Sequence, residues 1–119
     1  MKSNVSLIVS IVRKGWGSTA LQASVKAGAR GGTVLTGRGA GVHEQEKIFG
    51  MSIEPEKEIV LTMVYAAQVE TVLASIVEAA ELNEVGRGIA FVLPVDRVLG
   101  VAHFMGPGAG PPRDPESRS

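Results

Sequence analysis

Glycines at alternate positions mark two short segments that could hold a phosphate group through main-chain amides. Gly37, Gly39 and Gly41 follow the strand-like run Thr-Val-Leu-Thr, and Gly86-Arg87-Gly88 precedes an apolar run. Glycine has no Cβ, so backbone amides there come close to a bound group. Successive amides in such turns form concavities that bind anions. The two segments therefore predict a phosphate- or nucleotide-sized ligand that is bound mostly by main chain.

Both segments also have a purely structural interpretation. The glycines at 37, 39 and 41 could form a bulge or a sharp exit from a strand. Arg87 could be a solvated turn residue as readily as a phosphate contact. No Gly-Lys-Ser/Thr ending follows either segment, which excludes a P-loop, and no helix follows Gly41, which excludes a dinucleotide fingerprint.

Side chains that could catalyse a reaction are scarce. The two histidines, His43 and His103, lie far apart in the chain, so we expect no metal site. The serines have no evident His–Asp partners and no paired carboxylates occupy a predicted site, so we expect no enzyme. Lys57 stands among glutamates and is either one charge of a solvated cluster or an anion contact.

The composition indicates one soluble, globular domain. The chain has 119 residues, and its 12 basic and 12 acidic side chains cancel, so no overall field favours nucleic acid or an anionic membrane. The absence of cysteine is compatible with a reducing cytoplasm. Residues 5–12 are too short and too interrupted for a signal peptide, and no segment approaches the ~20 apolar residues of a membrane span. We expect a cytoplasmic protein without membrane insertion.

Apolar periodicity predicts strands and helices in alternation. We expect an N-cap at Ser18 or Thr19 for the first helix, with Leu21 and Val25 on its buried face and its end near Gly28. The second helix covers residues 68–81. The predicted strands are residues 5–12, 33–38, 57–65 and 89–95, with a short fifth extended piece at 98–104.

Two segments fall outside this regular pattern. Residues 41–56 form a long polar loop, and Phe49, Met51 and Ile53 alternate within it, so part of it could extend as a strand or contact another subunit. Loops of this length in small domains are usually functional. Residues 106–119 are rich in Pro, Gly, Ser and charge, and we expect a disordered tail after a domain at 1–105.

The order of elements predicts an α+β fold, a ferredoxin-like βαββαβ sandwich with two helices on one face of an antiparallel sheet. The other face of the sheet would expose Val, Thr and Leu side chains. Association with further copies of the chain is the natural way to cover such a face.

At this point the sequence resembles the PII signalling family, the trimeric nucleotide sensors of nitrogen and carbon metabolism. The resemblance covers residue 5 to about residue 103. It rests on residues 26–41, on residues 68–88 with the turn Gly86-Arg87-Gly88, and on Phe91-Val92-Leu93-Pro94-Val95-Asp96-Arg97-Val98.

The resemblance implies a homotrimer that binds an adenine nucleotide between subunits and docks on a transporter or a metabolic enzyme through its T-loop, here residues 42–56. Lys57 matches the lysine that contacts 2-oxoglutarate in typical members. We expect partner contacts from His43, Phe49, Met51 and Ser52. The nucleotide-binding positions that the resemblance implies are Thr33, Gly39, Ala40, Gly41, Met63, Gly86, Arg87 and Gly88.

With its departures from the family pattern, the sequence resembles a divergent, PII-like branch. Ile89 stands where typical members have a lysine, and Gly100 and Ala102 stand where they have two arginines. His43 replaces the T-loop glutamine, and no T-loop tyrosine is present. Each lost charge-assisted bond is worth roughly 1.5–3 kcal/mol, so AMP, ADP or a cyclic nucleotide suits the site better than ATP, and we expect no required metal. The alternatives are a scaffold trimer with a decayed nucleotide site, another ferredoxin-like sensor, or an enzyme that acts on a nucleotide.

Overall fold

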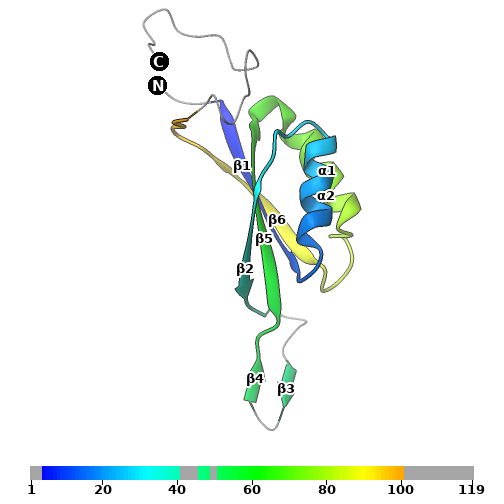
Figure 1. Ribbon diagram of the computed structural model, residues 1–119. Coiled ribbons are helices and arrows are strands. Elements are labelled where there is room, and N and C mark those ends of the chain that lie inside the picture. Colours follow the sequence, from blue (N-terminus) through cyan, green and yellow to red (C-terminus); the bar gives the residue numbers. More distant parts are fainter. Residues whose placement is uncertain (1–3, 41–45, 49–50, 101–119) are drawn as a thin grey trace, which may run out of the picture.

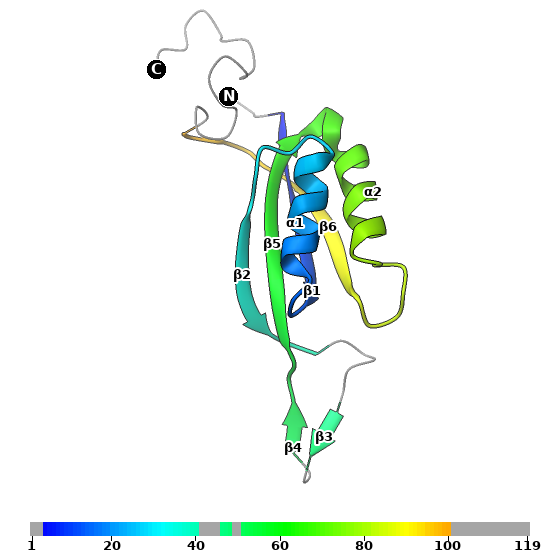
Figure 2. The same cartoon turned by 45° about the vertical axis from the view of Figure 1, so that its right-hand side comes forward.

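A four-stranded antiparallel sheet carries two helices on one face (Figures 1 and 2). The computed structural model describes residues 4–40, 46–48 and 51–100. The ferredoxin-like α+β fold predicted from the sequence is confirmed. The elements in chain order are β1 Val5–Arg13, α1 Gly17–Lys26, β2 Thr33–Arg38, β3 Glu46–Ile48, β4 Met51–Ile53, β5 Glu56–Tyr65, the 3-10 turn η1 Ala66–Gln68, α2 Val69–Ala79 and β6 Gly88–Pro94.

The strands of the main sheet follow the order β2-β5-β1-β6, and every neighbouring pair is antiparallel. The long apolar runs of β1 and β5 occupy the two central positions. In the register, Arg13 at the end of β1 lies opposite Lys57 near the start of β5, and Lys57 lies opposite Gly37 of β2. The opposite edge is formed by β6, where Gly88 faces Val12.

The core lies between the sheet and the helices. Alternate residues of the central strands, among them Ile8, Val12, Val60 and Val64, point to the helices and are almost fully buried. They pack with Val72, Ile76 and Ala80 of the second helical segment. Full burial of a Val or Ile side chain contributes roughly 1.5–3 kcal/mol, so this layer holds the helices on the sheet.

Helix α1 differs from the prediction at its start and on its buried face. It begins at Gly17 after Trp16, and neither Ser18 nor Thr19 caps it. Val25 is 46% exposed, so its predicted burial is wrong. The helix instead turns its smallest residues, Ala20, Ala23 and Ser24, to the interior.

Helix α2 lies within the predicted segment, with a 3-10 turn before it. After its C-cap, Ala80, the chain turns through Glu81, which has a φ of 56°. Glu81 is thus in the left-handed conformation although it is not glycine. The Leu82 amide donates to the Val77 carbonyl over 3.0 Å, which is the backbone bond that closes a Schellman motif. Glu81 thus occupies the position that glycine usually takes at a helix end.

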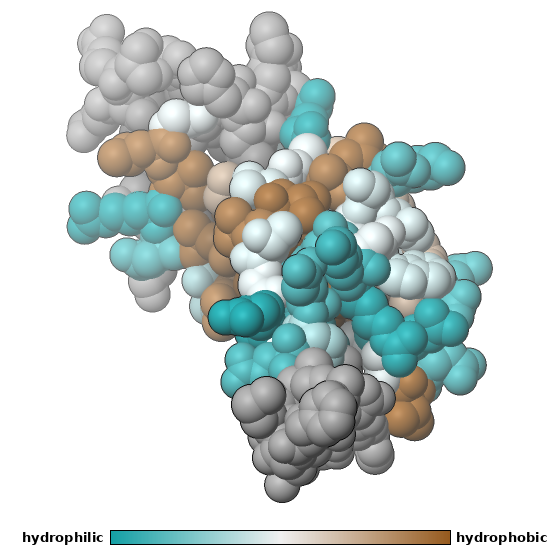
Figure 3. Space-filling view, turned by 60° about the horizontal axis from the view of Figure 1, so that its bottom comes forward, coloured by the Kyte–Doolittle hydropathy of each residue, from teal (hydrophilic) through white to brown (hydrophobic). Residues whose placement is uncertain are grey.

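The other face of the main sheet is apolar and open in the single chain. Since Ile8 and Val12 face the helices, the strand alternation places Leu7, Val9 and Ile11 on this open face. The register places residues of the other strands opposite them, on the same open face. Figure 3 shows apolar residues gathered on one side of the molecule. The exposed members are Leu35 at 45%, Ile89 at 59%, Phe91 at 40% and Leu93 at 47%.

Part of the predicted irregular loop forms a second, two-stranded sheet. Strands β3 and β4 pair antiparallel, with Ile48 opposite Met51, and this ribbon stands away from the main sheet beyond the end of β2 and the start of β5 (Figure 1). Phe49 lies outside the described residues. So do most of the predicted extended piece at 98–104 and the whole predicted tail, and the described residues 98–100 form no strand.

Candidate functional site

The two glycine-rich corners lie at the same end of the main sheet but on opposite edges. The first corner, residues 37–39, lies at the end of β2, whose last residue is Arg38, and the second corner, residues 86–88, leads into β6 at Gly88. The strand order places β5 and β1 between them. The two edges are therefore three strand spacings apart, about 14 Å. Within one chain, a compact ligand such as a single phosphate cannot contact both corners.

The corner at the β2 edge has room for a ligand. The Gly39 amide donates to the Pro55 carbonyl over 3.2 Å, which ties the end of β2 to the residue before β5. Among the described residues, a Cβ at Gly39 would meet no atom within 4 Å beyond its chain neighbours, and the φ of Gly39 is not in the left-handed range. The described part of the fold therefore gives no reason for glycine at this position. Ala40, which follows it, is exposed.

Lys57 lies beside this corner, on the open face of the sheet. Its side chain is 8% exposed, so the alternative of a charge within a solvated cluster is wrong. The register places it between Gly37 and Arg13. A buried cation between two glycine-rich corners is suited to an anionic ligand.

At the corner on the β6 edge, the structure explains why both Gly86 and Gly88 are glycine. Gly86 has a φ of 78°, and a Cβ at Gly88 would come within 2.2 Å of the Ile11 carbonyl oxygen. The Arg13 Nε donates to the Gly86 carbonyl over 2.8 Å. The turn before β6 is thereby fixed to the end of β1.

The Arg87 side chain folds back against its own chain. Its guanidinium lies 5.2 Å from the centre of the Trp16 ring. Its Nη2 lies 3.2 Å from the Glu81 Oε1, and the side chain of Arg87 is 30% exposed. A cation over the face of an indole is attracted by the ring quadrupole. These two contacts hold the guanidinium between the start of α1 and the end of α2.

Thr33 and Met63 lie toward the other end of the same strands. Thr33 begins β2 opposite Leu61, and Met63 follows two residues later along β5. Strand alternation therefore puts both on the open face. Thr33 is six residues from Gly39, roughly 20 Å along the strand, so the two would contact opposite ends of a long ligand.

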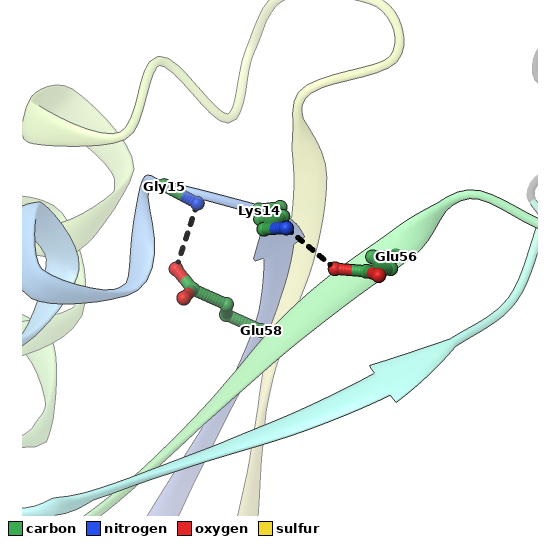
Figure 4. A network of polar contacts seen from close by, with 4 residues as sticks. All are labelled: Lys14, Gly15, Glu56 and Glu58. Carbon is green, nitrogen blue, oxygen red and sulfur yellow. Dashed lines mark hydrogen bonds and ion pairs between the residues drawn. The ribbon is translucent and has the colours of Figure 1, made fainter.

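A polar network connects the turn before α1 to β5 (Figure 4). The Glu58 Oε1 accepts a hydrogen bond from the amide of Gly15 at 2.9 Å. It also accepts one from the amide of Gly17 at 2.7 Å. Lys14 Nζ lies 2.9 Å from Glu56 Oε2. The hydrogen bond to the Glu56 carboxylate raises the pKa of Lys14 above its ordinary value of 10.5.

The remaining predicted site residues fall on the projecting loop. Gly41 and His43 lie outside the described residues, as does Phe49. Met51 and Ser52 are part of β4, where the backbone pairing alone is described. Their predicted role in partner binding stays a prediction.

Three residues near the β6 corner were missed by the sequence reasoning. Arg13, Trp16 and Glu81 each contact the turn at Gly86 and Arg87, although Arg13 and Trp16 are about 70 residues away in the chain. The unusual placement of Glu81 at a helix end was the signal that could have drawn attention to it. Nothing local to Arg13 or Trp16 indicated this contact.

The described part of the chain has neither a metal-binding cluster nor a helix that could span a membrane. No cluster of three or more His, Cys, Asp or Glu that could hold a metal ion occurs among the described residues. No helix there is both long enough and apolar enough to span a membrane.

Comparison with known proteins gives a family and solved structures that are similar to the chain. The family model for nitrogen regulatory protein P-II matches residues 5–102. A crystal structure of Arabidopsis thaliana PII bound to citrate is similar over 94% of both chains, with 31% sequence identity and a TM-score of 0.65. No curated protein matches the sequence. The match of the family model over most of the chain leads to one conclusion: the chain belongs to the P-II nitrogen regulatory protein family.

Proposed function

We propose that this P-II family chain forms a homotrimer that binds an adenine nucleotide between neighbouring subunits and regulates a partner protein through residues 42–56. The regulation is a shift between loop conformations that the nucleotide binds with different affinity. No catalytic step is part of the proposal. The partner class is a transporter or an enzyme of carbon or nitrogen metabolism, by analogy with the family.

The placement of the two glycine corners carries this proposal. They lie at one end of the sheet on opposite edges, with β5 and β1 between them. A neighbouring chain that brings its own β6 edge to the β2 edge of the first would unite them around one ligand. A site between subunits uses both corners, whereas a site within one chain uses only one.

The open sheet face supports association. It presents Leu35, Phe91 and Leu93, each at least 40% exposed in the single chain. A contiguous apolar face on a soluble protein marks an interaction surface. Three copies that bury this face against one another would also bring sheet edges of neighbouring chains together.

The proposed nucleotide lies along β2 with its base at Thr33 and Met63 and its phosphates toward Gly39, Ala40, Gly41 and the corner Gly86–Gly88 of the neighbouring chain. Lys57 is the contact for a phosphate or for a carboxylate effector. Ile89 presents an apolar, 59% exposed side chain beside the corner, and Gly100 carries no charge. With few cations available, we expect AMP or ADP to bind more tightly than ATP.

The β3–β4 ribbon is the proposed contact with the partner. It projects beyond the sheet at the end where the phosphates would bind (Figure 2). Gly39 is joined to Pro55 by a backbone hydrogen bond at the base of this projection. A ligand against Gly39 would therefore act at the base of the ribbon and change its orientation.

Isothermal titration calorimetry tests the proposal, with mass measured in parallel by sedimentation. AMP, ADP, ATP and cyclic AMP are each titrated with and without Mg²⁺, 2-oxoglutarate and citrate. We expect a trimer that binds one nucleotide per chain, with AMP or ADP preferred. A monomer, or a trimer that binds none of the nucleotides, contradicts the proposal.

A matched pair of variants locates the site. Gly39→Leu places a side chain where the fold leaves space, so it should abolish nucleotide binding without changing the melting temperature. Ala74→Leu introduces the same leucine side chain on the exposed side of α2 and should bind as the native chain does. Equal affinity in both variants would show that the ligand does not contact the β2 corner.

A second candidate function is a scaffold trimer without a ligand. It is favoured by the β6 corner, where the backbone conformation of Gly86 and the close approach at Gly88 explain both glycines. Loss of a phosphate site would leave these glycines in place. This alternative expects a protein that sediments as a trimer and shows no heat of binding with any of the nucleotides.

A further inference from the structure

We propose that Trp16 and Glu81 form a latch that holds Arg87 away from the nucleotide phosphates, so that these two residues set the affinity of the site. This inference rests on the proposed function, because it concerns how Arg87 reaches the same ligand. The latch is defined as the contacts of the Arg87 guanidinium with the Trp16 ring and the Glu81 carboxylate. Binding of a phosphate requires the guanidinium to exchange these partners for the ligand.

The geometry of the latch fixes the guanidinium on two sides. The centre of the Trp16 ring lies 5.2 Å from the Arg87 Cζ, and the Glu81 Oε1 lies 3.2 Å from the Arg87 Nη2. Trp16 is itself held by its backbone, which donates to the Arg13 carbonyl and accepts from the Ala20 amide, both over 3.0 Å. The side chain of Arg87 is 30% exposed, less than expected for an arginine in a solvated turn.

The backbone around Arg87 is fixed separately from its side chain. Arg13 Nε donates to the Gly86 carbonyl over 2.8 Å, and the Arg87 amide donates to the Glu84 carbonyl over 3.3 Å. Rotation about the side-chain bonds of Arg87 can therefore release the guanidinium while the corner keeps its shape. The latch and the main-chain phosphate site can work independently.

The conformation of Glu81 indicates that its carboxylate has a role. A residue with a side chain at a φ of 56° is strained relative to glycine, which is the usual residue at a helix end of this type. Glycine would stabilise the turn but could not pair with Arg87. The chain thus keeps a strained residue whose carboxylate competes with an anionic ligand for the same cation.

The latch can be tested first without a ligand, because Trp16 is the single tryptophan of the chain. Its fluorescence reports on the group that covers its ring. We expect the emission to change in Arg87→Gln and to change in the same direction in Glu81→Gln. The control is Glu84→Gln, which removes the same charge from the same turn, and Glu84 forms no ion pair among the described residues. It should leave the emission as in the native chain.

Titration with ADP then tests whether the ligand and the latch compete for Arg87 in the assembled protein. Titration of the native chain with ADP should shift the Trp16 emission in the direction of Arg87→Gln. By calorimetry, Glu81→Gln should bind ADP about two- to fivefold more tightly than Glu84→Gln, the range expected for release of one partly exposed ion pair. Glu81→Gly removes the same carboxylate and relieves the backbone strain, so it should also bind more tightly.

Each alternative outcome separates this inference from the proposed function. If ADP binds but the emission does not respond to ADP or to Arg87→Gln, the latch is wrong and the nucleotide site stands. If Glu81→Gln and Glu84→Gln gain the same affinity for ADP, the gain comes from the loss of any negative charge in this turn, and the latch is again wrong. If no variant binds any nucleotide, both the proposed function and this inference fail.

Discussion

At the scale of single residues, different physical causes explain why glycine stands at each of the two corners. Gly88 is enclosed by the backbone of β1, and a Cβ there would come within 3.1 Å of the Val12 Cα as well as against the Ile11 carbonyl. A Cβ at Gly39 would meet no atom of the other described residues within 4 Å. The first glycine serves the packing of β6 on β1, and the second leaves a surface open.

This difference predicts opposite effects of the same substitution. Gly88→Ala should lower the free energy of unfolding by about 1–3 kcal/mol or more, because the new methyl group overpacks against backbone that cannot move without disturbing the sheet. Gly39→Ala should change it by less than about 0.5 kcal/mol, as surface substitutions usually do. Urea denaturation at one protein concentration measures both. Equal losses in the two variants would contradict this assignment.

At the scale of elements, the start of α1 depends on a residue of β5. The amides of Gly15 and Gly17 both donate to the Glu58 carboxylate, which lies on the helix-facing side of the sheet next to the buried Val60. Free amides at a helix start favour a negative charge. Glu58 thus caps α1 in the way that a local Ser or Thr usually does.

Glu58→Gln should therefore destabilise the fold. The amide side chain keeps an acceptor but loses the charge, and hydrogen bonds to charged groups are worth about 1.5–3 kcal/mol. We expect a loss of about 1–2 kcal/mol in the free energy of unfolding by urea denaturation. Glu56→Gln, on the same strand, removes only the exposed pair with Lys14 and should have no measurable effect. A loss in both variants alike would show that general charge, not the cap, matters.

The Lys14–Glu56 pair has its own dependence on pH. Since folding raises the pKa of Lys14 above 10.5, the pair stabilises the folded state at neutral pH. This contribution is fully present below 10.5 and disappears as the pH rises through the raised value in the folded state. Both side chains are well exposed, so the effect is small.

These elements also show what sequence patterns can predict. The strands at 5–12, 33–38 and 57–65 agree with β1, β2 and β5 within a residue, because their apolar runs are long and local. The cap of α1 was wrong because Glu58 lies 41 residues from Gly17, beyond any local pattern. Arg87 was recognised as a candidate, but its contacts with Trp16 and Glu81 depend on the folded arrangement. The buried position of Lys57 likewise follows from the sheet and not from its acidic neighbours.

At the scale of the whole molecule, the open sheet face is an apolar surface that a single chain does not cover. Leu7, Val9 and Ile11 on β1 and their neighbours on β5 and β6 form one apolar layer. Burial of apolar surface contributes about 25 cal/mol per Å². A layer of this extent favours association over exposure to water.

A charge on this face should prevent assembly. Phe91→Asp places a carboxylate on the open face of the edge strand β6, opposite Val9, where an interface would leave it without water. We expect sedimentation to give the mass of a monomer and calorimetry to show no nucleotide binding. Val85→Asp introduces the same charge at a residue that is 72% exposed, in the turn before β6, and should assemble as the native chain does. An assembled Phe91→Asp protein would place the interface elsewhere.

The separation of the two glycine corners on opposite sheet edges has a consequence for heredity as well as for binding. If each site joins the β2 edge of one chain to the β6 edge of another, a single chain contributes two different halves to two different sites. Two alleles, one defective at Gly39 and the other at the β6 corner, would then complement each other in a mixed trimer, because one junction would combine the two intact halves. A chain defective at both corners would instead have a dominant-negative effect, because it would impair the sites of any trimer that it formed with intact chains.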